Sequence, residues 1–222
     1  EFPPRAMTGY KNYFEGHGEF CVSASQYDGT HYPYKAFNKL YGGNFDDLVG
    51  WYPGANSVSP YDGTDGEYTG SVRLGEGTAT GDWLKLKLPY KIKLQRYELW
   101  TQYNVTSNAP EDGILYAKND DDSVWTQIHS FVSGTPPSVS IPARFNVNTS
   151  NYYKNYAFVA TKKTTRPNGI TIGEWRLFGT REQGQSVLHD GQLTLTKNLN
   201  VPRIGPALDA DDTPRRDRLV VE

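Results

Sequence analysis

Residues 81–100, with the sequence GDWLKLKLPYKIKLQRYELW, constrain the fold of this chain more than any other stretch. Apolar and polar residues alternate from Leu84 to Leu94, and the alternation slips by one residue near Gln95. A period of two is typical of a strand with one buried face, and the slip indicates a β-bulge. We interpret the stretch as two strands joined at Pro89-Tyr90, with Lys85 and Lys87 exposed. The predicted core positions are Leu84, Leu86, Leu88, Ile92 and Leu94.

The rest of the chain also favours strands. It holds 16 tyrosines, 9 phenylalanines and 5 tryptophans, together with 22 glycines and 14 prolines. Aromatic residues favour strands, and glycine and proline favour the turns between them. Alternating segments predict further strands at 20–29, 112–120, 123–131, 138–147, 152–163 and 170–180. Residues 32–70 are loop-rich with one helical turn near KAFNKL, so the sequence predicts an all-β sandwich.

The chain divides into three parts by composition. Residues 1–19 indicate an irregular lead-in, residues 20–180 the sandwich, and residues 181–222 an extended polar tail. Two short apolar runs in the tail, QLTLTKNL and RLVV, can each form a strand that cannot bury a face alone. We expect the tail to pair with another chain or to begin a following domain.

Several function classes are disfavoured by what the sequence lacks. A net charge of −2 gives no electrostatic case for nucleic acid, and no apolar run suits membrane insertion. The four histidines have no metal-ligand spacing, and no nucleophile elbow or phosphate loop is present. The single cysteine, Cys21, is expected to act as a small hydrophobe. Acidic clusters at 62–67 and 120–122 could supply a glycosidase pair, but solvated loop acids are the commoner role, so we expect no enzyme.

The order of the segments resembles a known family. YKAFN is followed by GW, GDWLKLKLPYKIKLQRYEL, LYAKNDDDSVWTQI, YYKNYAFVATKK and GEWRLFGT. This set resembles the discoidin, or coagulation factor 5/8 type C, domain, whose relatives include galactose-binding-like carbohydrate-binding modules. Together with PPRAMT near the start and LTLTKNLNVP after the last strand, it is similar to discoidin-like modules in structural and fibre proteins of large algal DNA viruses. The resemblance implies a jelly-roll sandwich over residues 20–180.

The resemblance also implies a ligand site in loops at one end of the sandwich. Sugar recognition needs an exposed aromatic face with polar neighbours. The loop over residues 52–73 offers such groups, and the candidates are Tyr52, Tyr61, Asp62, Asp65, Glu67, Tyr68 and Arg73. The alternative for each tyrosine is a loop-anchoring role. The tryptophans are expected to pack inward instead, and they are Trp51, Trp83, Trp100, Trp125 and Trp175.

A structural Ca²⁺ ion is the cofactor that the resemblance implies. The family site maps to Asn38 and Glu174, although Asn38 stands where the family has an aspartate. Ca²⁺ takes several oxygen ligands, including backbone carbonyls. The alternative for Glu174 is a salt bridge to Arg176 or Lys35.

Three functions follow from these observations. The first is a non-enzymatic binding module of a viral structural protein, displayed on the virion within an oligomeric assembly and recognising glycan or a capsid neighbour. The second is an accessory carbohydrate-binding module of a glycan-active enzyme whose catalytic domain lies elsewhere. The third is a minor capsid or fibre subunit that binds no sugar.

Overall fold

The structure is a computed structural model. It describes residues 1–40, 50–54, 60–101, 109–132, 141–164 and 169–183, and the backbone alone of 186–189 and 192–195. The elements in chain order are β1 (Lys11–Phe14), β2 (Gly18–Ala24), η1 (Pro33–Phe37), β3 (Asp82–Trp100), β4 (Pro110–Lys118), β5 (Thr126–Phe131), β6 (Ala143–Asn146), β7 (Tyr153–Lys163), β8 (Glu174–Arg181), β9 (Ser186–His189) and β10 (Gln192–Leu195).

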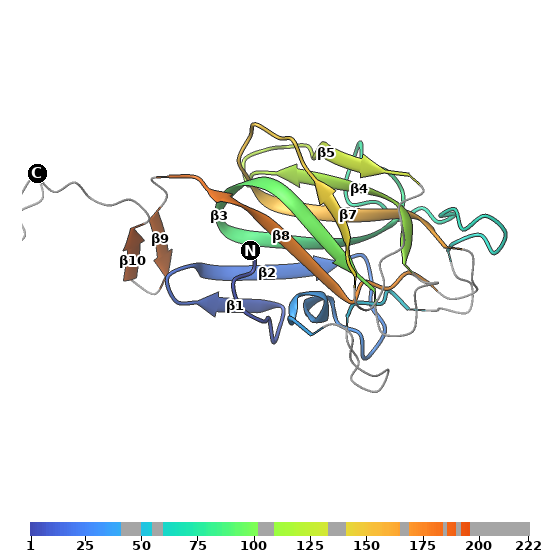
Figure 1. Cartoon of the computed structure of the whole chain (residues 1–222), viewed down its shortest axis with the longest axis horizontal. Helices are drawn as coiled ribbons and strands as arrows, with labels where there is room; N and C mark the ends of the chain where they lie inside the picture. The colour runs from blue at the N-terminus through green and yellow to red at the C-terminus, as the bar shows by residue number, and fades with distance from the viewer. Residues whose placement is uncertain are drawn as a thin grey trace, which may run out of the picture.

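Strand β3 joins the two layers of the sandwich. Its first half pairs with β2 and β7, and its second half pairs with β8 and β6. Figure 1 shows β3 curving back on itself at one end of the molecule. The first layer has the order β1-β2-β3-β7-β4-β5, and all pairings are antiparallel. The predicted all-β sandwich is confirmed.

The predicted break of β3 into two strands at Pro89-Tyr90 is wrong. The strand runs unbroken for 19 residues, and only its register against β7 shifts between Lys87 and Ile92. Proline lacks an N–H and interrupts a ladder locally, but here the chain bends instead of turning. Because the concave side of the bent strand faces the core on both sides of Pro89, buried and half-buried residues alternate through the bend without a change of phase.

The predicted bulge and core of β3 are confirmed. The register against β8 shifts between Leu94 and Arg96, where the alternation slips. All five predicted core positions are at most 1% exposed, and they are Leu84, Leu86, Leu88, Ile92 and Leu94. Lys85 and Lys87 are half-buried rather than exposed. The Lys87 ammonium lies 2.8 Å from Asp120 Oδ1.

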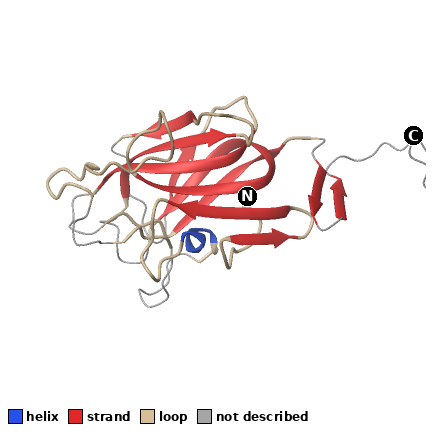
Figure 2. Cartoon of the chain, turned by 180° about the vertical axis from the view of Figure 1, so that it is seen from behind, coloured by secondary structure: helices blue, strands red, loops and turns tan. Residues whose placement is uncertain are grey.

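The N-terminal residues are ordered elements of the fold, not an irregular lead-in. Strand β1 forms a hairpin with β2, and Phe2 forms an isolated bridge with Leu177 at the edge of β8. Phe2 and Met7 belong to the hydrophobic core. The predicted helical turn is present as η1, which packs against β2 and β8 and is the blue coil in Figure 2.

In the described residues of the tail, β9 and β10 pair with each other as a two-stranded sheet. The sequence predicted β10 within QLTLTKNL but did not predict β9. The RLVV segment lies outside the described residues. Among the tryptophans, Trp51, Trp100 and Trp175 are buried as expected, whereas Trp83 and Trp125 are half-buried.

Candidate functional site

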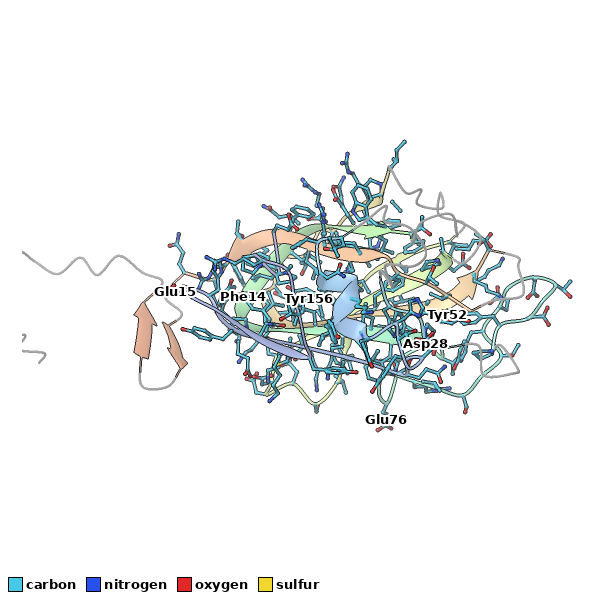
Figure 3. The ribbon with its side chains drawn as sticks, turned by 90° about the horizontal axis from the view of Figure 1, so that it is seen from below. Phe14, Glu15, Asp28, Tyr52, Glu76 and Tyr156 are labelled. Carbon is cyan, nitrogen blue, oxygen red and sulfur yellow. The ribbon has the colours of Figure 1, made fainter. Side chains whose placement is uncertain are left out.

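Loops gather at one end of the sandwich, which we call the loop end. It holds the described loop residues 25–34, 50–54, 60–81 and 169–173, opposite the β1–β2 and β4–β5 turns. Figure 3 shows Asp28 and Tyr52 together toward this end, with Phe14 and Glu15 at the other. The seven residues predicted to bind glycan all belong to these loops, and five of them lie together within residues 61–68.

Tyr61 and Tyr68 pack against the sandwich instead of forming platforms. Tyr61 is 3% exposed, and its hydroxyl donates to the Ala160 carbonyl at 3.3 Å. The edge of one ring meets the other, with centroids 5.0 Å apart. Burial raises the pKa of Tyr61 well above its usual value, so its hydroxyl stays neutral. A ring held this way contributes apolar burial, and its face is not available to a sugar.

The aspartates of this loop accept hydrogen bonds from backbone N–H groups of the loop itself. Asp62 Oδ1 accepts the N–H groups of Thr64 and Asp65 at 2.6 and 3.4 Å, and Asp65 Oδ1 accepts the N–H of Glu67 at 3.0 Å. These are Asx-type turn bonds, and those from Thr64 and Asp65 lower the pKa of Asp62. Glu67 lies 4.0 Å from the Lys162 ammonium.

The side chains of the two remaining candidates contact other segments. Arg73 is exposed, and its Nη1 donates to the Thr78 carbonyl at 3.5 Å within the next turn. Tyr52 is half-buried and meets the His31 ring edge-on, with centroids 5.8 Å apart. Its carbonyl accepts the N–H of Asp28 at 3.1 Å. Tyr52 therefore supports the neighbouring 28–31 loop, which is the anchoring role that the sequence left open.

Asp28 fixes the 28–31 loop. Its Oδ1 accepts the N–H groups of Thr30 and His31 at 2.9 and 2.5 Å, and its Oδ2 lies 2.8 Å from His31 Nδ1. Burial alone would raise the pKa of Asp28, but these hydrogen bonds outweigh it and lower the pKa. The loop is thereby held in one conformation by a charged acceptor, and such bonds are stronger than neutral ones.

This loop supports an exposed cluster of four tyrosines, which we call the tyrosine patch. Tyr10 and Tyr27 are 39% and 47% exposed, and Tyr32 and Tyr34 are half-buried. Tyr32 and Tyr34 stack at 5.5 Å with an interplanar angle of 10°. The Tyr27 ring lies 5.4 Å from that of Tyr32, and the Tyr10 ring lies 5.6–6.4 Å from the other three.

Polar groups border the tyrosine patch. The Lys35 ammonium lies 5.6 Å from the Tyr32 ring centroid and donates to the Thr30 carbonyl at 2.7 Å. Burial and a hydrogen bond with Tyr27 raise the pKa of Tyr10, so its hydroxyl stays neutral. Neutral phenols donate and accept hydrogen bonds. The patch therefore combines aromatic faces with hydroxyl and ammonium groups, which is the chemistry that a sugar site needs.

The sequence contains part of the signal for this patch. QYDGTHYPYKAF places three tyrosines within eight residues around a proline, beside an Asp-Gly turn. The fourth, Tyr10, lies 17 residues before Tyr27 and reaches the patch through the pairing of β1 with β2. The Val22 N–H donates to the Tyr10 carbonyl at 2.9 Å. That pairing was missed because residues 1–19 lack a clear alternation.

The described residues around Asn38 and Glu174 do not fit a divalent cation. Glu174 is fully buried, and its Oε2 accepts the Lys39 N–H at 3.0 Å. The Lys39 ammonium and Arg176 Nε lie 3.9 and 3.7 Å from Oε1. Ca²⁺ needs several oxygen ligands, whereas two cationic side chains surround this carboxylate. Residues 41–49, with Asp46 and Asp47, lie outside the described part.

The alternative role predicted for Glu174, a salt bridge to Arg176 or Lys35, is confirmed for Arg176 only. Burial raises the pKa of its carboxyl to about 8, although Lys39 and Arg176 act to lower it. The salt bridge to Arg176 is present. Lys35, the other predicted partner, bonds the Thr30 carbonyl instead, and Lys39 takes the second position. Asn38 Oδ1 accepts the N–H of Leu40 at 2.9 Å, within its own turn.

Other reactive groups in the described residues offer little chemistry. Burial and a hydrogen bond to Glu19 raise the pKa of the half-buried Cys21 thiol, which disfavours the thiolate. No group of three or more histidine, cysteine or acidic side chains that could hold a metal occurs in the described part of the chain. The described ranges also contain no helix long and apolar enough to span a bilayer.

Comparison with known proteins identifies the fold. No protein-family model and no curated protein matches the sequence. A family 32 carbohydrate-binding module of Clostridium perfringens NanJ, solved with galactose, is similar in structure, with a TM-score of 0.50 and 12% identity over 71% of this chain and 92% of that one. A second module from Clostridium perfringens, solved with GalNAc-β-1,3-galactose, gives 0.52 and 11% over 72% and 95%. At this identity the likeness concerns the fold, and the chain has the galactose-binding-like, discoidin-type jelly roll.

Proposed function

We propose that this chain is a non-catalytic carbohydrate-binding domain whose sugar rests on the tyrosine patch. The observation that carries the proposal is the cluster of four mutually packed, solvent-accessible tyrosine rings at the loop end. The fold supports it, since two modules with this fold were solved with galactose and with GalNAc-β-1,3-galactose.

The patch suits a pyranose by shape and chemistry. The C–H face of the sugar packs on Tyr27, the most exposed of the four rings, and its hydroxyls bond the phenol groups and the Lys35 ammonium. Contacts among the rings hold them in place before the ligand arrives. Asp28 holds the intervening loop. A preorganised site loses less side-chain entropy on binding, so a shallow surface can still bind a sugar.

A glycan array followed by titration calorimetry tests this proposal. Galactose and GalNAc-β-1,3-galactose are the first probes. We expect Tyr27→Ala to weaken binding about tenfold or more, which corresponds to a loss of about 1.4 kcal/mol. Tyr13→Ala is the matched control, because Tyr13 is 38% exposed and lies outside the patch. Equal losses in both variants, or no glycan bound at all, would refute the proposal.

The biological setting of the domain is a separate proposal. We infer from the sequence resemblance that the domain is displayed on a virus particle beside other capsid or fibre subunits. The fold suits an accessory module of a glycan-active enzyme equally well. Immunogold electron microscopy of purified particles separates the two: labelled particles support the first setting, and labelling of an enzyme complex alone supports the second.

A further inference from the structure

Glu174 is an unusual group to find at the start of β8. Its side chain is fully buried, and Oε1 accepts no hydrogen bond from the described residues. A buried carboxyl group loses its hydration, which raises its pKa, so only nearby positive charge can keep it ionised. The source of that charge determines whether the fold depends on a metal ion.

Four charged side chains form one cluster here, and they are Glu1, Lys39, Glu174 and Arg176. The Lys39 ammonium pairs with Glu1 and lies 3.9 Å from Glu174. Arg176 Nε lies 3.7 Å from both carboxylates. With Glu174 ionised, these four side chains have a formal charge of zero, and with Glu174 protonated they have a formal charge of +1. In either state a divalent ion would add two positive charges to described side chains that carry no net negative charge.

Both cations are fixed in position. The Arg176 guanidinium lies 5.5 Å from the Trp100 ring centroid, a cation–π distance. Lys39 has a φ of 63°, in the left-handed region that residues other than glycine and asparagine rarely adopt. This conformation places its backbone N–H on Glu174 Oε2 and its ammonium beside Oε1. One residue thus supplies both a hydrogen bond and a charge to the same carboxylate.

We propose that Lys39 and Arg176 act as built-in counterions for Glu174, so that this domain folds and remains stable without Ca²⁺. The ammonium and guanidinium supply the positive charge that a bound ion would otherwise provide. The inference concerns stability alone and does not depend on the proposed glycan binding.

Thermal melting of the full chain in Ca²⁺ and in chelator tests the metal half of the proposal. We expect the same melting temperature in both solutions, and no heat when CaCl₂ is titrated calorimetrically into the chelated protein. A metal that binds only the folded state would raise the melting temperature. A melting temperature that rises in Ca²⁺ for the wild type would overturn the proposal without any variant.

A double-mutant cycle tests the counterion half. Lys39→Met removes the charge and keeps an unbranched side chain of similar length, and we expect it to lower the melting temperature by about 5 °C or more. Glu174→Gln should also lower it, and the double variant should lose less than the sum of the two. Lys11→Met, at an exposed position, is the control. Additive losses, or Lys39→Met melting like the control, would refute the role of Lys39. If Lys39→Met does not fold, the cycle is run with Arg176→Met.

Discussion

Two tyrosine-rich regions of the loop end use the same residue types in opposite ways. Residues 60–70 place Tyr61 and Tyr68 against the sandwich and leave their acids in the solvent. The tyrosine patch leaves its rings accessible and uses Asp28 inside the supporting loop. Composition alone would favour residues 60–70, which are richer in acids, as the sugar site.

The backbone explains the difference. Residues 60–70 run beside β7, where Tyr68 donates its N–H to the Thr161 carbonyl and Lys163 donates its N–H to the Gly66 carbonyl. These bonds draw the loop onto the sheet and direct Tyr61 inward. The 28–31 loop instead bonds to itself and to Tyr52. The neighbouring rings then meet each other rather than the core.

Removing one tyrosine ring from each region tests most directly whether the two regions differ in packing. We expect Tyr61→Ala to lower the free energy of unfolding by about 3–5 kcal/mol, as for other large buried aromatics. Tyr27→Ala should change it by no more than about 0.5 kcal/mol, because its ring is 47% exposed. Urea unfolding measures both. Similar values for the two variants would mean that the regions do not differ in packing.

The sequence predicts the fold better than the site, and β3 shows why. Alternation from Leu84 to Leu94 predicts burial directly, because successive side chains of a strand point to opposite faces of the sheet and the apolar ones face the core. The burial of Tyr61 depends instead on β7, where its hydroxyl bonds Ala160, 99 residues further along the chain. Likewise, Tyr10 reaches Tyr27 only through the β1–β2 hairpin. Contacts between distant segments produce no periodic pattern in the sequence. The sequence therefore indicated which end of the sandwich carries the candidate site, but not which residues form it.

Gly66 offers a second way to test how residues 60–70 are fixed. It has a φ of 79°, and a Cβ added there would lie 2.1 Å from the Lys163 carbonyl oxygen. We expect Gly66→Ala to lower the free energy of unfolding by about 1–3 kcal/mol. Gly63→Ala, in the same loop but with open space around its Cβ, should have little effect. Equal urea midpoints would show that the close approach of this loop to β7 does not contribute to stability.

Asp28→Ala tests the tyrosine patch without touching a ring. Loss of the bonds to Thr30 and His31 should free the loop that carries the neighbouring tyrosines. We expect glycan affinity to fall about three- to tenfold, an effect smaller than that of removing Tyr27, because the rings remain present. Asp62→Ala is the matched control, since its bonds lie within residues 62–65. If both variants bind like the wild type, the loop does not hold the patch.

The smallest effect concerns pH. The hydrogen bonds to Asp28 lower its pKa below the ordinary value of an aspartate. A depressed carboxyl pKa stabilises the folded loop at every pH above the unfolded value, and that stabilisation is lost as the pH falls through the folded value. Glycan affinity measured by calorimetry should therefore stay level from pH 7 to about pH 5 and decline only below about pH 4. Asp28→Asn should flatten this acid limb. A decline between pH 7 and pH 5 would instead assign control of the loop to a histidine, because histidine is the side chain that ordinarily titrates there.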